Sequence, residues 1–533
     1  MKYLPIKKCH ALKVWIIVAC FSFGASHSIT FGSIKIGWAS SNTTPTQPTL
    51  ISGQFYARYS EGVVDSLYAT ALALESDGKS IGKRIVMVSC DLVGIPDYLR
   101  DRVRELVVKA VPILNMDDIL LNATHTHTAP VMSQTESNEF YGIPYQWFTR
   151  GKTSMTPKEY FEFAVQKISE AAIQAWESRG EGGISYGLSK AVVGHNRLQV
   201  DRNGKSQMYG NTSRPEFSHI EGYEDHNLNL LYTWDRSGKL TGIIINAAVP
   251  SQVSGQLYEI SADFWTEART LLREEIGKDL FILSQVSAAG DQSPYTMWGG
   301  PAEERMQRLM GFEKDGIGRN TIGRRKVIAR HIADGVTAIL PYMKENIEWD
   351  PIFSKKVEIV PLPRRSLGTF NAEFVENLRK EMEENQAEYE NMLADLTKNP
   401  YKREGNRWYK DITTANSLYE RAKRVYERYQ SVDTVDPFVW VELGAIRISD
   451  MVFVSNPFEL YLDYGIQIKV KSPAVQTFIV QLAGAGTYLP TQRSIDGGAY
   501  GAVPASTKVG PEGGDVLVDK TVELIHSLWN RGE

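Results

Sequence analysis

The stretch Ile119-Leu120-Leu121-Asn122-Ala123-Thr124-His125-Thr126-His127-Thr128-Ala129-Pro130 joins an apolar run to two histidines separated by one residue. The apolar run predicts a strand over residues 119–123. Side chains two residues apart in a strand lie on one face, so this spacing predicts that His125 and His127 reach a common site. Histidine is a frequent metal ligand and titrates near neutral pH. A pair of hydrogen-bonded structural histidines is the alternative interpretation.

The segment before this stretch sets the fold class. Residues 85–89 form another apolar run, and residues 98–110 have the apolar spacing of a helix. A strand, a helix and a second strand in this order predict a βαβ unit with parallel strands. Further strands are expected over residues 242–248, 280–286, 451–455 and 477–482. The sequence therefore predicts a mixed α/β fold, with a largely parallel sheet core and flanking helices.

Polar side chains with chemical capacity follow five of the expected strands. Ligands of open α/β sheets bind beyond the carboxyl ends of the strands, so these side chains are expected to line one cleft. Asp and Ser are also common turn residues, which is the alternative for each of them. The residues are Asp91, the pair His125 and His127, the pair Asp291 and Ser293, Glu459, and Tyr488.

Residues 370–430 differ in composition from the rest of the chain, because Glu, Lys, Arg, Tyr and Leu dominate there. This pattern predicts two long helices that form a hairpin. We expect a solvated, charged helical insertion. A cap over the cleft and a subunit contact are the alternative roles. We expect residues 29–533 to be one catalytic domain that carries the hairpin as an insertion.

The overall composition excludes one class of partner. With 42% hydrophobic and 10% aromatic residues, the 533-residue chain can bury a large core. Its formal net charge of -4 provides no basic field for phosphate backbones. We therefore expect no nucleic acid partner.

The first residues resemble an export signal. Lys7, Lys8 and Lys13 precede an apolar segment over residues 14–25, and small residues follow it. Residues 1–28 are thus expected to be a signal peptide of a periplasmic or secreted protein. Cleavage before Cys20, followed by lipoprotein anchoring, is the alternative. Cys90 is then the single cysteine of the mature chain, which rules out an internal disulfide.

Several segments together resemble the neutral/alkaline, non-lysosomal ceramidase family, whose members are zinc-dependent amidases acting on N-acyl sphingosine. Residues 123–130 are similar to the family segment Thr-His-Thr-His-Ser-Gly/Ala-Pro, and Gly-Asp-Gln-Ser-Pro at residues 290–294 is similar to Gly-Asp-Val-Ser-Pro. Asn196-Arg197 resembles a family Asn-Arg segment, and residues 456–459 resemble its Pro-Gly-Glu turn. Residues 488–491 with Tyr500 resemble its tyrosine segments. The order is that of the family, and we expect the smaller C-terminal domain of family members to be missing.

The resemblance implies a role for each matching residue. His125, Glu459 and Tyr488 correspond to zinc ligands, and His127 to the histidine that faces the scissile carbonyl. Arg197 and Tyr500 correspond to residues that hold or polarise that carbonyl, and Ser293 stands at a proposed nucleophile position. Three ligands and an open position allow zinc to activate water and polarise a carbonyl.

One departure from the family concerns the metal. The family has a second zinc-binding histidine in a segment that resembles residues 246–252, where this chain has Val249 or Pro250. His226 is a candidate substitute, although its Asp-His-Asn setting is equally typical of a turn. The segment Ser-Ala-Asp that ends at Asp263 also resembles the family, and we expect Asp263 to be structural.

Three functional hypotheses follow from these observations. The first is an exported, zinc-assisted hydrolase that cleaves the amide of an N-acyl lipid such as ceramide, with peripheral contact to a membrane surface. The second is a metal-independent serine esterase or deacylase on a lipid or glycan, with Ser293 as nucleophile and His127 as base. The third is a lipid- or glycan-binding protein without activity, which the missing histidine favours.

Overall fold

The βαβ unit expected from the sequence is present in the computed structural model, which describes residues 34–366, 372–431 and 434–529. It consists of β6 (Arg84–Cys90), α1 (Asp97–Ala110) and β7 (Ile119–Ala123). β6 and β7 pair in parallel, with Val86 opposite Ile119 and Cys90 opposite Ala123. All five residues of β7 are buried, as expected of a strand inside a sheet covered on both faces.

The unit ends an eight-stranded sheet with the order β18-β16-β15-β10-β1-β5-β6-β7. The mixed α/β class is confirmed, but the expected predominance of parallel strands is not found. Parallel pairing is limited to β6 with β7 and β16 with β18, while the five pairs between them are antiparallel. The other strands are β1 (Ile34–Asn42), β5 (Tyr68–Ser76), β10 (Gly180–Lys190), β15 (Asn227–Asp235), β16 (Leu240–Ala247) and β18 (Phe281–Val286).

Short connections explain two of the antiparallel pairs in this sheet, β5 with β6 and β15 with β16. Residues 236–239 join β15 to β16, and Gly238 there has a φ of 77°. A connection of this length closes a hairpin, whereas parallel neighbours need a crossover of a dozen or more residues. The two parallel pairs, β6 with β7 and β16 with β18, are joined by longer crossovers that contain α1 and α4 (Phe264–Glu275).

A second sheet of four strands packs face to face with the first. Its order is β20 (Phe353–Pro363), β21 (Phe438–Ile448), β22 (Met451–Ser455) and β24 (Gln476–Val480). Phe453 and Phe478 stack with their ring centroids 4.2 Å apart, and both belong to one buried cluster with Leu72 and Met87 of the large sheet. The apolar layer between the two sheets is therefore a core.

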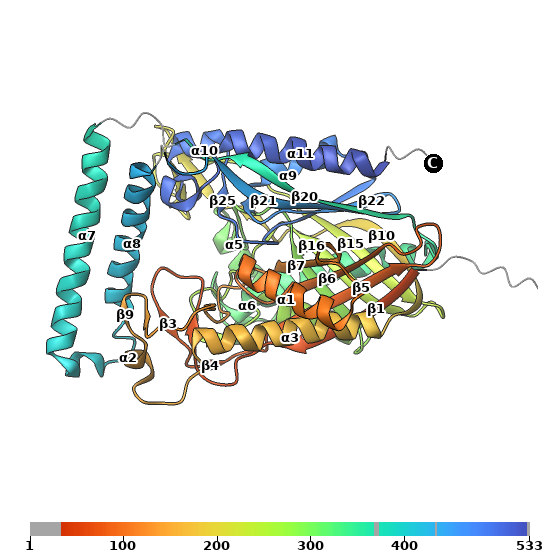
Figure 1. Ribbon diagram of the computed structural model, residues 1–533, viewed down its shortest axis with the longest axis horizontal. Coiled ribbons are helices and arrows are strands. Elements are labelled where there is room, and N and C mark those ends of the chain that lie inside the picture. Colours follow the sequence, from red (N-terminus) through yellow and green to blue (C-terminus); the bar gives the residue numbers. More distant parts are fainter. Residues whose placement is uncertain (1–33, 367–371, 432–433, 530–533) are drawn as a thin grey trace, which may run out of the picture. The chain divides into compact units, whose positions relative to one another are not determined.

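Helices cover the outer face of each sheet, which gives four layers (Figure 1). α1, α3 (Pro157–Glu177), α4 and α6 (Ile322–Glu345) pack on the large sheet, and α9 (Leu462–Lys471) and α11 (Pro511–Trp529) pack on the small one. Alternate residues of β5 face the two sides: Ala71 and Ala73 belong to the helix-covered cluster, and Leu72 and Leu74 to the layer between the sheets.

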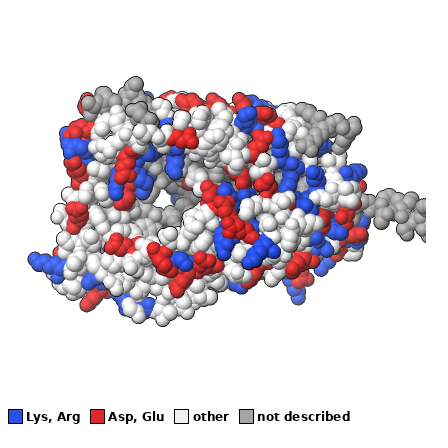
Figure 2. Space-filling view, in the orientation of Figure 1, with Lys and Arg blue, Asp and Glu red and all other residues white. Residues whose placement is uncertain are grey.

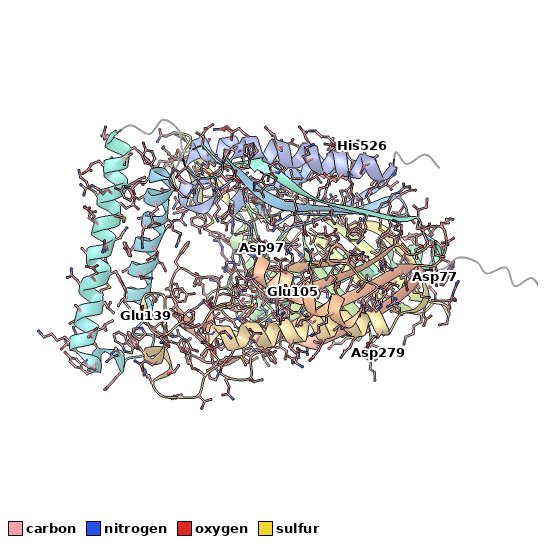
Figure 3. The ribbon with its side chains drawn as sticks, viewed as in Figure 1. Asp77, Asp97, Glu105, Glu139, Asp279 and His526 are labelled. Carbon is pink, nitrogen blue, oxygen red and sulfur yellow. The ribbon has the colours of Figure 1, made fainter. Side chains whose placement is uncertain are left out.

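The predicted helical hairpin is confirmed as α7 (Ala372–Lys398) and α8 (Lys410–Gln430). It lies at one end of the ribbon in Figure 1. It is anchored to the rest of the chain by hydrogen bonds. Thr413 of α8 accepts from the backbone N–H of Ala57 at 3.0 Å, and the Tyr389 hydroxyl of α7 donates to the carbonyl of Gly142. Glu139 in Figure 3 marks β8 (Glu139–Phe140), beside the hairpin. The first two residues of the predicted span, 370 and 371, lie outside the described residues.

Some sequence predictions cannot be compared with the structure. The export signal over residues 1–28, with Cys9 and Cys20, lies outside the described residues. Within the described ranges, no helix is long and apolar enough to cross a membrane. On the face drawn in Figure 2, acidic and basic side chains are interspersed rather than gathered into a patch of one sign.

Candidate active site

His125 and His127 meet at the end of β7, but strand geometry is not the cause. β7 ends at Ala123, and His125 has a φ of 64°, in the left-handed region. This turn brings the two rings to 4.9 Å between centroids with 77° between their planes, and their Nε2 atoms lie 3.4 Å apart. The expected proximity is present because the chain turns sharply after the strand.

Hydrogen bonds orient both imidazoles. His125 Nδ1 lies 2.6 Å from the carbonyl oxygen of Val93, so this nitrogen donates a hydrogen bond and Nε2 is the ring atom that faces the Glu459 carboxylate. Gln252 Nε2 lies 2.9 Å from His127 Nε2, and the carbonyl of Gly53 accepts from the same ring. The amide nitrogen of Gln252 only donates, so His127 Nε2 is an acceptor. Burial, with the nearby charges of His125 and two arginines, holds the pKa of His127 well below its usual value.

Glu459 and Tyr488 reach the histidines from two short strands. β23 (Glu459–Leu460) and β25 (Tyr488–Leu489) pair in parallel and place these residues side by side. Glu459 Oε2 lies 3.4 Å from His125 Nε2, and the Tyr488 hydroxyl is hydrogen bonded to Glu459. Burial opposes the charge of Glu459, but His125 outweighs it and keeps the pKa of this carboxyl low. Burial and the Glu459 charge raise the pKa of Tyr488 well above its usual value.

The loop before Tyr488 is held to the βαβ unit. Asp97, labelled in Figure 3 at the start of α1, accepts a hydrogen bond of 3.0 Å from the backbone N–H of Ala485. The tyrosine segment is therefore fixed against the same helix that follows β6.

Arg197 is a buried cation with several neutral partners. It follows β11 (His195–Asn196), is 4% exposed, and donates to the Gly290 carbonyl at 2.8 Å and the Tyr488 hydroxyl at 3.2 Å. It also donates to Gln252 Oε1 at 3.3 Å. Burial would lower the pKa of Arg197, but Tyr488, Tyr209 and Glu459 outweigh it and raise the pKa well above its usual value, so the guanidinium stays charged.

Tyr500 completes this wall of the site from a short 3-10 helix, Tyr500–Ala502. Its ring makes an edge contact with Tyr488 at 5.8 Å between centroids. Burial raises the pKa of Tyr500, so its hydroxyl carries a proton at neutral pH and is able to donate it in a hydrogen bond.

These side chains line a pocket of about 620 Å³. Six of the seven residues that the resemblance assigned to chemistry contribute to its wall: His125, His127, Arg197, Glu459, Tyr488 and Tyr500. The remaining wall is formed by residues that the sequence analysis did not select, among them Gln54, Phe55, Tyr209, Gln252, Tyr295 and Arg319. Five of those six are polar or aromatic residues outside any motif, and only Gln252 lies in a segment that the sequence analysis compared with the family.

Ser293 is placed differently from the other selected residues. It lies in β19 (Gln292–Ser293), is fully buried, and does not line the pocket. Its hydroxyl donates to the Tyr295 carbonyl at 3.0 Å and accepts from the Tyr295 N–H at 3.1 Å. Both hydrogen bonds are those of a turn residue.

Two of the strand-exit carboxylates also lie away from the pocket wall. Asp91 is fully buried in a two-pronged ion pair with Arg269, at 2.6 and 2.9 Å. Asp291 accepts from the Leu462 N–H at 3.0 Å and from Asn196 Nδ2 at 2.8 Å. The five strand exits therefore do not form one cleft, and only those of the two histidines, Glu459 and Tyr488 meet. Asp263 begins α4, where its side chain accepts from the Phe264 N–H at 2.7 Å, a structural role as expected.

The position of the missing histidine is occupied by side chains that are unable to bind a metal. Val249 is fully buried in the core beneath α4 and α6. Gln252, two residues beyond Pro250, is the residue of this segment that contacts His127. His226 is not a substitute, since it lies against Glu224, at 3.2 Å, together with His195.

The donor set suits a zinc ion, with a phenol as the third ligand. Across the described ranges, no group of three or more His, Cys, Asp or Glu side chains is arranged to hold a metal. His125 Nε2 faces the Glu459 carboxylate at 3.4 Å, and Tyr488 adds an oxygen next to that carboxylate. Zinc accepts nitrogen and oxygen ligands of these kinds, and three protein ligands are sufficient in a catalytic site. The residues present fit the ion.

Comparison with solved structures identifies the fold. The crystal structure of neutral ceramidase from Pseudomonas aeruginosa superposes with a TM-score of 0.63 and 15% identity, over 94% of this chain and 75% of that one. The chain has the neutral ceramidase fold. A structure described as ceramidase complexed with C2 gives a TM-score of 0.60 and 14% identity, over 94% of this chain and 76% of the other. No family model and no curated protein sequence matches. At these identities the ceramidase likeness is one of architecture, so the function is argued from the site.

Proposed function

We propose that this chain is a hydrolase that cleaves the amide bond of an N-acyl compound with the assistance of zinc. One observation carries the proposal. His125, Glu459 and Tyr488 converge on one pocket, and His127, Arg197 and Tyr500 line the same pocket. Solved structures of the same fold are named ceramidases, which makes an N-acyl lipid such as ceramide the first substrate to test.

The protein side chains provide the groups that amide hydrolysis requires. Arg197 is charged and Tyr500 is protonated, so both are able to donate to the carbonyl oxygen as negative charge develops on it. His127 lines the pocket as a neutral imidazole, and we assign to it the transfer of a proton from the attacking water to the leaving nitrogen, once the Gln252 N–H has moved away from Nε2. Water adds to the carbonyl carbon, the C–N bond breaks, and an acid and an amine leave.

Zinc would be held by His125, Glu459 and Tyr488. When bound, it lowers the pKa of a coordinated water to about 7 and polarises a carbonyl. We further propose that the protein is exported before it acts, in agreement with the signal expected over residues 1–28, and that a lipid substrate brings it to a membrane surface.

The serine mechanism has less support. Ser293 is fully buried, and its hydroxyl is hydrogen bonded at both ends to Tyr295. A nucleophilic serine needs a base within hydrogen-bonding distance, and His127 makes its contacts with Gln252 and His125 instead.

The test combines metal analysis with hydrolysis. The purified full chain is analysed for zinc and incubated with a panel of N-acyl sphingosines and N-acyl amino acids, and acid release is followed. We expect about one zinc per chain, loss of hydrolysis with a chelator and recovery on adding zinc. Hydrolysis by fully metal-free protein would contradict the metal-assisted mechanism, and binding without turnover would support the non-catalytic hypothesis.

A matched pair of variants separates the site from the rest of the chain. His125→Ala removes a proposed ligand, so zinc content and hydrolysis should both be lost. His526→Ala makes the same chemical change at an exposed position of α11, labelled in Figure 3, and both properties should be retained. Equal zinc contents in the two variants would exclude His125 as a ligand.

A further inference from the structure

The pocket has more positive than negative side chains. Arg197 and Arg319 line it, and Glu459 is the only acidic residue in its wall. Arg58 lies beneath His127, is fully buried, and donates to the backbone carbonyls of Gly255 and Leu257 at 3.0 and 2.7 Å. In the described part of the chain, no carboxylate lies within 4 Å of the Arg58, Arg197 or Arg319 guanidinium.

A fourth arginine approaches from the helical hairpin. Arg421 of α8 lies over the rings of Tyr500 and Phe55, at 5.0 and 5.8 Å from their centroids. Its Nη2 donates to the Ser506 hydroxyl at 2.7 Å, a neutral partner. The aromatic wall of the pocket is therefore covered by a further cation.

Contacts along the wall lead from the reacting groups to Arg319. Arg197 contacts Tyr209, and the Tyr209 ring packs against Tyr295 at 6.3 Å between centroids. The Tyr295 hydroxyl donates to Asn320 Oδ1 at 2.6 Å, next to Arg319 in the chain. Arg319 Nη2 donates to the Thr296 carbonyl at 3.3 Å, which leaves most of the guanidinium available.

Two features of this wall indicate that it binds a ligand and is not merely hydrated. Arg197 is 4% exposed, yet its Nε has no hydrogen-bond partner in the described structure. The Glu459 carboxylate acts on Arg197 but forms no ion pair with it, and an anion in the pocket would offset the cost of burying this cation. Only Phe55, Val93 and Met208 contribute purely apolar side chains to the wall, which is few for a substrate with two long alkyl chains.

We propose that the substrate carries an anionic group in the part that leaves with the amine, and that Arg319 with Asn320 binds this group. The inference rests on the proposed function, because Arg197, His127 and Tyr500 are taken to hold the scissile amide. A guanidinium binds a carboxylate or sulfate through paired hydrogen bonds, and an amide N–H of Asn320 adds a third donor. The arginines of the wall also concentrate anions in the pocket.

The experiment compares substrates that differ in charge alone. Hydrolysis of N-octanoyl-glutamate is measured beside that of its neutral diamide and of N-octanoyl-sphingosine, with the zinc-loaded full chain. We expect kcat/KM to be at least about tenfold higher for the glutamate than for the diamide, mainly through KM, and this ratio to fall as salt is added. Equal values for the two would overturn the inference while leaving the hydrolase proposal intact.

Two variants test whether Arg319 is responsible for the preference for the glutamate over the diamide. Arg319→Gln should reduce the glutamate-to-diamide ratio about tenfold, whereas Arg308→Gln, at an exposed position of α5 (Gly300–Leu309), should leave the ratio unchanged. A ratio that is the same in both variants would exclude Arg319 as the binding residue.

Calorimetric binding of N-octanoyl-glutamate provides a readout that does not depend on turnover. Binding that weakens about tenfold in the Arg319→Gln variant supports the anion site even if no substrate is cleaved, in which case the hydrolase proposal alone fails. No measurable binding by the natural chain would overturn the anion site.

Discussion

At the residue scale, the candidate site depends on one conformation that a strand pattern does not include. His125 has a positive φ, which costs a residue other than glycine of the order of 1 kcal/mol or more and is concentrated at functional sites. Without this turn, the two imidazole Nε2 atoms would not lie 3.4 Å apart. The sequence gives the residue types of the pair, and the backbone turn that joins them is visible only in the structure.

Gln252 is the residue whose role is most open to test. Arg197 only donates, so it fixes the Gln252 amide with Oε1 toward itself and Nε2 toward His127. Gln252→Leu keeps the shape but removes both contacts, so His127 loses the donor that orients it. We expect kcat to fall about tenfold to a hundredfold, the usual effect of losing a partner of a catalytic or ligating histidine.

The matched control is Gln256→Leu. Gln256 also lines the pocket, but it has no side-chain hydrogen bond in the described structure, so kcat should change less than twofold there. Equal losses in the two variants would contradict an orienting role for Gln252, and nitrogen NMR of the His127 ring would show which nitrogen carries the proton.

Asp291 should make stability depend on pH. Burial raises its pKa from 3.8 to about 6. Between these values the folded protein holds a proton that the unfolded chain has released, so this group stabilises the fold below pH 4 and that contribution is lost as pH rises to 6. The free energy of unfolding falls by about 3 kcal/mol over this range, at 1.36 kcal/mol per pKa unit.

Urea unfolding of the natural chain and of Asp291→Asn at several pH values would isolate this contribution. The amide does not titrate, so the difference in free energy of unfolding between the two proteins should change by about 3 kcal/mol from pH 4 to pH 7. Parallel pH curves would show that Asp291 titrates normally.

At the scale of the element, predictions succeeded where apolar runs were dense. β7 and β22 have the predicted limits, and the hairpin helices lie within the predicted span. β10 was not predicted, because its glycines weaken the strand pattern. β5 was not predicted either, because alanines occupy alternate positions of this strand. The pairing direction was wrong for the centre of the sheet, since one βαβ unit was taken as typical of all strands. In these cases tertiary packing, and not the local sequence pattern, decided which segments form strands and how the strands pair.

α3 provides a test at this scale because its start is well defined. The Thr156 hydroxyl accepts from the Glu159 N–H at 3.2 Å, and the Glu159 carboxylate accepts from the Thr156 N–H at 2.7 Å. Thr156→Ala removes half of this capping box and should lower the free energy of unfolding by about 1 kcal/mol in urea titration. Thr153→Ala, at an exposed position before the helix, should change it by less than about 0.5 kcal/mol.

At the scale of the whole molecule, the layered architecture followed from contacts that no local pattern records. The sequence indicated strands, helices and their class, but the stacking of the two sheets depends on residues such as Phe453 and Met87, which belong to one buried cluster although they are far apart in the chain. The same limit applied to the strand exits. Asp91 and Asp291 have the residue type and the location of site residues, yet their partners, Arg269 and Leu462, are supplied by distant segments and bury them elsewhere.

The Asp91–Arg269 pair joins the βαβ unit to α4, and its loss should be felt by the entire fold. Asp91→Asn leaves the Arg269 guanidinium buried without a full counter-charge, so the free energy of unfolding should fall by about 3–5 kcal/mol. The exposed pair of Lys520 and Glu523 on α11 is the comparison, and Glu523→Gln should leave the free energy of unfolding almost unchanged. Similar costs at the two pairs in chemical denaturation would contradict this account.

The helical hairpin has a practical consequence for protein engineering. It is contributed by one continuous segment, and its Arg421 lies over the rings of Phe55 and Tyr500, while the two histidines, Glu459 and Tyr488 are held by other strands and loops. A mutant library confined to α8 around Arg421 would therefore alter this wall of the pocket without changing the residues that we propose to bind zinc. Changes in selectivity would then be obtained from a single short cassette of the gene.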